Sequence, residues 1–98
     1  MKKSNSFKAI QRCLEKIESV LNDVESTIEF YINEVEERKN EIASQQTPEI
    51  TNKEIEKIYN DDWRLQNNID ELESIQCQKI VWNHVYNYIF ENYNKIFK

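Results

Sequence analysis

The fold is decided by residues 7–42, which read FKAIQRCLEKIESVLNDVESTIEFYINEVEERKNEI and contain neither glycine nor proline. Two rows of apolar residues run through this stretch, each with a step of seven residues. One row comprises Phe7, Leu14, Leu21, Ile28, Val35 and Ile42, and the other comprises Ile10, Ile17, Val24 and Tyr31. Together the rows give alternating steps of three and four, which place one narrow apolar seam along a long α-helix. Such a seam must pack against another helix.

The composition of the 98-residue chain favours a single all-α domain over residues 1–98. Hydrophobic residues make up 39% of the chain and charged residues 32%, a balance more polar than that of most globular domains. Glycine is absent and proline occurs once, which argues against folds that need many tight turns, such as β-sandwiches and barrels. The regular apolar seam argues against disorder, which the low apolar content alone would permit.

A second helix is predicted after a short connection. We expect helix 1 over about residues 6–46, a connection over 46–50 and helix 2 over about 51–97. Thr47 with Pro48, or Thr51 with Glu54 in a capping-box pattern, can start helix 2. A connection this short predicts a long antiparallel helical hairpin, similar to a coiled coil.

Two places in helix 2 interrupt its apolar pattern and leave a three-helix bundle as the alternative. Asp62 takes an expected apolar position, so a break near 60–62 would let an Asp or Asn cap a new helix. Lys79 also takes an expected apolar position and indicates a break or a shift in register near 76–79.

The carboxyl-terminal segment is too apolar around its circumference for one antiparallel neighbour to cover. Six of the eleven aromatic residues lie between positions 82 and 97. Tyr and Trp concentrate in protein interfaces because they combine a large apolar body with a polar tip. The predicted partner-binding residues are Trp82, Tyr86, Tyr88, Ile89, Phe90, Tyr93 and Phe97, together with Trp63 nearer the connection. Three arrangements would bury this segment: a homodimer that forms a four-helix bundle, an intramolecular core, or a foreign protein partner.

The sequence predicts no catalytic, cofactor-binding or metal-binding residues. A turn near Pro48 would bring Cys13 level with His84, but no orienting amide or oxyanion loop accompanies this pair, so we interpret it as chance adjacency. The same register separates Cys13 from Cys77 by too much for a disulfide. One histidine and scattered carboxylates do not form a metal-ligand pattern, and phosphate-cradling loops need glycine.

The net charge of −5 disfavours nucleic acid and anionic membranes as partners, because phosphate binding requires clustered cations. No apolar run reaches the roughly 18 residues that span a bilayer, and no signal-peptide core is present, so a cytoplasmic setting is expected. The abundance of Asn, Ile, Lys, Glu and Tyr is typical of an AT-rich genome, such as that of a low-GC bacterium, its phage or a large virus.

We therefore predict a non-enzymatic protein–protein interaction module, a small adaptor or an inhibitor, that dimerises into a four-helix bundle. In a phage or mobile element, such a chain would act on a host protein. Its length and two-helix layout are similar to those of the helical hairpins of type VII secretion, which makes an exported hairpin the alternative. The Trp-x-Gly turn of that family is missing, since the connection reads Gln46-Thr47-Pro48-Glu49. A second alternative is an acidic mimic of nucleic acid, based on the glutamates between Glu29 and Glu41.

Overall fold

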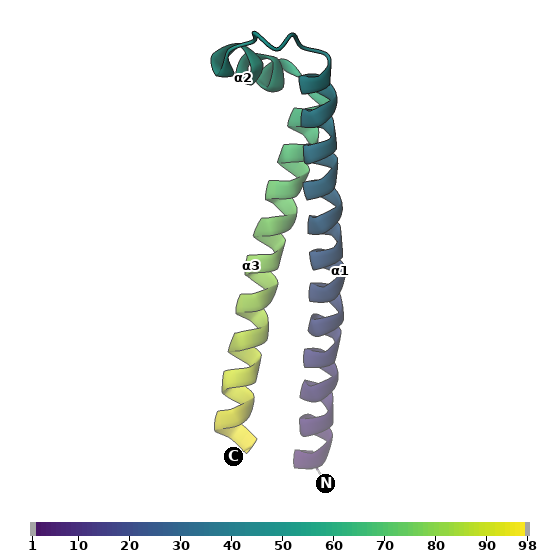
Figure 1. Cartoon of the computed structure of the whole chain (residues 1–98). Coiled ribbons are helices and arrows are strands. Elements are labelled where there is room, and N and C mark those ends of the chain that lie inside the picture. The colour runs from purple at the N-terminus through teal and green to yellow at the C-terminus, as the bar shows by residue number, and fades with distance from the viewer. Residues whose placement is uncertain (1, 98) are drawn as a thin grey trace. The chain divides into compact units, whose positions relative to one another are not determined.

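The computed structural model describes the backbone of residues 2–97 and the side chains of residues 7–93 and 95. Over this range the chain forms three α-helices: α1 (Lys2–Ser44), α2 (Asn52–Asp61) and α3 (Trp63–Phe97) (Figure 1). The predicted all-α fold and helical hairpin are confirmed. The chain divides into two compact units. Unit 1 comprises Met1–Ser26 and Cys77–Lys98, and unit 2 comprises Thr27–Gln76.

In unit 1 the first part of α1 packs antiparallel on the last part of α3. The hydroxyl of Tyr86 donates a hydrogen bond to Oε1 of Glu18 at 2.8 Å. The rings of Phe7 and Tyr93 lie 5.3 Å apart between centroids. The side chains of the seam that unit 1 buries are Leu14, Ile17 and Val24. Around them Phe7, Ile10 and Leu21 are half-buried.

The register of unit 1 differs from the one expected for a turn at Pro48. The contact of Glu18 with Tyr86 places Cys13 level with about residue 91, and the contact of Phe7 with Tyr93 places it level with about residue 87. His84 lies three to seven residues from these levels, about 5 to 10 Å along the axis, so Cys13 and His84 are not level as expected. The physical reason is that the chain reverses several residues after Pro48. Both cysteines are free thiols at exposed positions.

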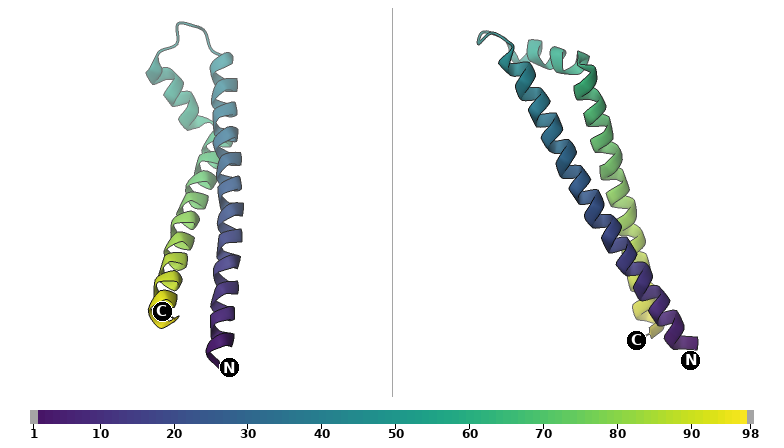
Figure 2. Two further views of the ribbon diagram at one scale, coloured as in Figure 1. Left: turned by 60° about the horizontal axis from the view of Figure 1, so that its bottom comes forward. Right: turned by 90° about the vertical axis from the view of Figure 1, so that its right-hand side faces the viewer.

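In unit 2 the helix α2 lies across α1 instead of alongside it (Figure 1 and Figure 2). Of the two possible starts, the structure uses Thr51, whose Oγ1 accepts a hydrogen bond from the backbone N–H of Glu54 at 3.2 Å. No glycine closes the preceding helix. Instead, the side chains of Ser44 and Gln46 donate to the last backbone carbonyls of α1, those of Glu41 and Ile42.

A single residue separates α2 from α3. The backbone N–H of Asp62 donates to the carbonyl of Tyr59, and its side chain accepts from the backbone N–H of Leu65 at 2.8 Å. Asp62 therefore ends α2 and caps the start of α3. It also accepts two hydrogen bonds from Arg38 of α1, at 3.0 Å from Nε and 2.7 Å from Nη2. This paired contact fixes the corner of unit 2 against α1.

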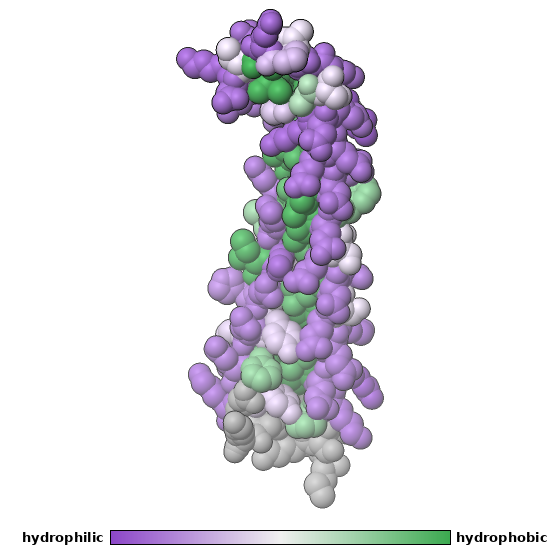
Figure 3. All heavy atoms as spheres, viewed as in Figure 1, coloured by the Kyte–Doolittle hydropathy of each residue, from purple (hydrophilic) through white to green (hydrophobic). Residues whose placement is uncertain are grey.

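The core of unit 2 is small, with Ile42 and Leu65 as its buried residues among the described side chains. The seam residues Ile28, Tyr31 and Val35 are half-buried. Within each unit, Figure 3 shows hydrophobic residues along the line where α1 and α3 meet, with mainly hydrophilic residues and a few hydrophobic ones on the flanks of this face. This is the distribution that a seam of steps of three and four produces.

Candidate functional site

One side of α3 in unit 1 faces α1 and is used within the chain. Trp82, Tyr86, Ile89 and Tyr93 follow one another at steps of four, three and four, and all four are half-buried. Tyr86 and Tyr93 make the contacts with α1 described above. The hydrogen bond to the Glu18 carboxylate raises the pKa of the Tyr86 hydroxyl, because the charged acceptor favours the protonated phenol. Four of the predicted partner-binding residues thus contribute to packing inside unit 1.

The opposite side of α3 in unit 1 carries apolar side chains that are exposed among the described residues. Ile80, Val81 and Tyr88 are 60%, 58% and 70% exposed, and Val85 is also exposed. We call this surface the outer face of α3, defined by Cys77, Ile80, Val81, His84, Val85 and Tyr88. Only Tyr88 of this set was among the predicted partner-binding residues. A signal for the others was present in the sequence, because the inward-facing residues already account for one full helical stripe.

The outer face is also free of formal charge. Residues 80–90 read IVWNHVYNYIF and contain no Asp, Glu, Lys or Arg, in a chain of which 32% is charged. Scattered exposed apolar residues are normal on a protein surface. A contiguous apolar patch without charges is not, and such patches mark sites of protein interaction. The outer face therefore has the chemistry of a docking surface.

The other predicted contact residues have different surroundings. Phe90 is 45% exposed, and its ring stacks on that of Tyr86 with centroids 6.1 Å apart. The side chain of Phe97 is not among those that the structure describes. In unit 2, Trp63 is 80% exposed at the first position of α3. The guanidinium of the neighbouring Arg64 approaches the carboxylates of Glu34 and Glu41.

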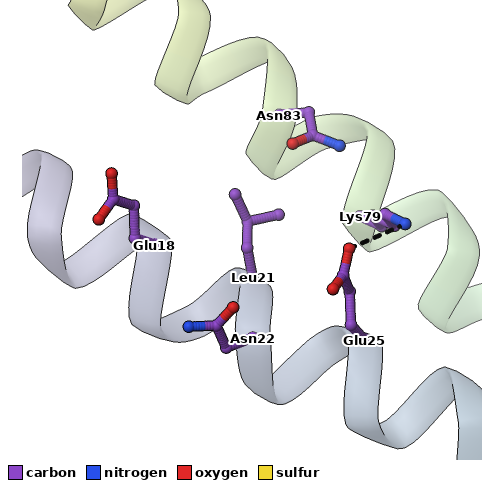
Figure 4. A pocket seen from close by; sticks show the side chains of 6 residues that line it. All are labelled: Glu18, Leu21, Asn22, Glu25, Lys79 and Asn83. Atoms are coloured by element: carbon purple, nitrogen blue, oxygen red, sulfur yellow. Dashed lines mark ion pairs between the residues drawn. The ribbon is translucent and has the colours of Figure 1, made fainter.

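A depression of about 330 Å³ lies between α1 and α3 in unit 1. Figure 4 shows Leu21 in it, surrounded by Glu18, Asn22, Glu25, Lys79 and Asn83. Nζ of Lys79 pairs with Oε1 of Glu25 at 3.2 Å. The helix does not break here, since α3 continues through residues 76–79. Lys79 is tolerated at a seam position because its stem packs while its charged end reaches solvent and Glu25.

Replacing Lys79 with leucine is expected to raise the free energy of unfolding by roughly 0.5 to 1 kcal/mol, because leucine adds apolar contact at a half-buried seam position. The ion pair that is lost is exposed and is worth little. Urea unfolding followed by circular dichroism measures the change. Lys79→Gln, which removes the pair without adding apolar surface, is the control and should leave stability nearly unchanged. A decrease in stability for Lys79→Leu would show that the ion pair outweighs the packing.

The described side chains include no group of three or more Cys, His, Asp and Glu that could hold a metal ion. Across residues 2–97, no helix combines the length and apolarity needed to cross a bilayer. Comparisons of the chain with family models, with curated proteins and with solved structures found no match. What the protein does is therefore inferred from its surface.

Proposed function

We propose that this chain is a non-enzymatic helical module of the cytoplasm that works by binding protein, as a small adaptor or an inhibitor, and that it forms homodimers. In a phage or mobile element, an inhibitor of this kind would occupy the surface of a host protein and block it. The binding surface is the outer face of α3. No catalytic step is assigned to the chain.

The observation that carries the proposal is the exposure of Ile80, Val81 and Tyr88 on one uncharged helical face. Covering such a face releases free energy at roughly 25 cal/mol per Å² of apolar area. Interfaces draw their affinity from buried aromatic anchors surrounded by residues that exclude water. Tyr88 is the aromatic anchor, and Ile80, Val81 and Val85 are the surrounding residues that exclude water.

A photo-cross-linking amino acid placed at position 88 tests the proposal. We expect benzoylphenylalanine in place of Tyr88 to trap a protein on illumination in cells, either a second copy or a foreign partner. The matched control carries the same amino acid in place of Ser19, an exposed position on α1 outside the outer face. Both variants should keep the helical circular dichroism of the original chain. Equal or absent cross-linking at the two positions would contradict the proposal.

A further inference from the structure

We propose that the outer face of α3 pairs with the same face of a second copy of the chain, in an antiparallel arrangement that places Cys77 of each copy opposite Tyr88 of the other. This inference rests on the proposed function, because it names the protein that the surface binds. It adds the surface used, the direction of the two helices and the register between them.

The spacing of the outer face is that of a second helical seam. Cys77, Val81, His84 and Tyr88 follow one another at steps of four, three and four, and all four are exposed. Ile80 and Val85 flank this row on its two sides. Steps of three and four keep side chains on the line of contact between two helices, so this row can form knobs-into-holes layers with another helix. The inward-facing row of α3 has the same spacing and already packs on α1.

The sizes of the side chains favour an antiparallel pair. In that direction the layers match Cys77 with Tyr88 of the second copy and Val81 with His84 of the second copy. Each layer then combines a smaller side chain with a larger ring, which is how facing positions interdigitate. In a parallel pair, Tyr88 would face Tyr88 of the second copy, and Cys77 would face Cys77 of the second copy. The first layer would be overfilled and the second would leave a void.

The distribution of charge along α3 also favours an antiparallel pair, and it favours a second copy of the chain as the partner of the outer face. The row continues past Tyr88 with Glu91 and Lys95, both exposed. In a parallel pair, Glu91 would face Glu91 of the second copy and Lys95 would face Lys95 of the second copy. In an antiparallel pair, both residues lie beyond the ends of the uncharged layers. A charged foreign surface would have to bury its charges unpaired against residues 80–90, which is costly. A second copy brings a face with no charge and with two-fold self-complementarity. Four layers form a small interface, so the pair should associate reversibly.

Disulfide trapping tests the register. Cys13→Ser leaves Cys77 as the sole thiol, and Tyr88→Cys then adds a second one. Within one chain, positions 77 and 88 are about 16 Å apart along the helix, too far for an internal bond. On mild oxidation of the two thiols by diamide, we expect the double variant to give a covalent dimer on a non-reducing gel. Mass spectrometry should show position 77 linked to position 88. Cys13→Ser alone should remain a single chain over the same time.

The inference is overturned if Cys13→Ser alone forms a dimer through position 77 as fast as the double variant, because this would indicate a parallel pair. It is equally overturned if the double variant forms no dimer. A second measurement avoids dependence on the cysteines. In sedimentation equilibrium, Val81→Glu should weaken the dimer about tenfold or more, because it places a carboxylate in an uncharged layer. Ser19→Glu, which adds the same charge on α1 outside this face, should leave it unchanged.

The failure of this inference and the failure of the proposed function give different results. If the original chain sediments as a monomer at every concentration while the cross-linker at position 88 traps a foreign protein, the self-pairing and the homodimer of the proposed function are both wrong. The binding of a foreign protein through this face then stands. If position 88 traps neither a foreign protein nor a second copy, both are wrong.

Discussion

Replacing Leu65 with alanine is expected to lower the free energy of unfolding by about 3 kcal/mol, within the range measured for buried Leu→Ala changes. Leu65 is 0% exposed and is the largest fully buried side chain that the structure describes. The loss combines the transfer of the removed methyl and methine groups with the cavity that they leave. Relaxation into that cavity is limited, because the capping bond to Asp62 holds the backbone of Leu65 in place.

Urea unfolding followed by circular dichroism at low protein concentration measures this change without a contribution from self-association. Leu72→Ala is the matched control, since it makes the same chemical change two turns further along α3 at a half-buried position. We expect the control to cost about half as much, because less apolar area is lost from contact. Equal losses for the two variants would mean that the corner of unit 2 is no more tightly packed than the rest of α3.

The helices and their pairing could be predicted from the sequence because they depend on local periodicity. The steps of three and four between Phe7 and Ile42 require one continuous helix and a partner for its seam. The start of α2 follows the same kind of local rule, since the hydroxyl of Thr51 satisfies a backbone N–H in the first turn. In the described side chains, burial falls on seam positions such as Ile17 and Val24.

The corner of unit 2 could not be predicted in full, because it depends on contacts between residues far apart in the sequence. Asp62 stood out as a polar residue at an apolar position and as a potential cap. Its pairing with Arg38, 24 residues earlier, requires the transverse direction of α2, which no local pattern encodes. The shift of the register past Pro48 has the same origin.

The candidate binding surface was predicted in kind but not in its residues. The excess of apolar residues after Ile80 showed that one neighbour could not cover the segment. Which aromatic rings would turn inward depended on the register with α1, and this is set by contacts such as the one between Tyr86 and Glu18. The aliphatic members of the outer face, Val81 and Val85, lie off the helical stripe that faces α1, which is the signal that could have separated them from core residues. They carry no polar tip, and the predicted contact residues were chosen mainly among aromatic rings, so they were missed.

Asp62→Asn is expected to destabilise the fold at neutral pH. On acidification, the variant should lose less stability than the original chain loses. Asparagine caps a helix about as well as aspartate, so the change removes the charge that binds Arg38 while it keeps the cap. In the folded chain, the hydrogen bonds from Arg38 and from the backbone of Leu65 lower the pKa of Asp62 from 3.8 to about 2. The ionised carboxylate therefore stabilises the fold fully above pH 3.8, and this contribution is lost as the pH falls toward about 2.

The measurement is the urea midpoint of each protein at several pH values from neutral down to pH 2. The difference between the original chain and Asp62→Asn should be constant at neutral pH and should shrink as the pH falls below 3.8, because protonation removes the same charge that the variant lacks. Asp61→Asn removes the same charge from an exposed neighbour at the last position of α2 and is the control, which should leave the urea midpoint at neutral pH nearly unchanged. If the gap for Asp62→Asn stays constant down to pH 2, the carboxylate does not contribute through its charge. Its role would then be limited to the cap that asparagine can replace.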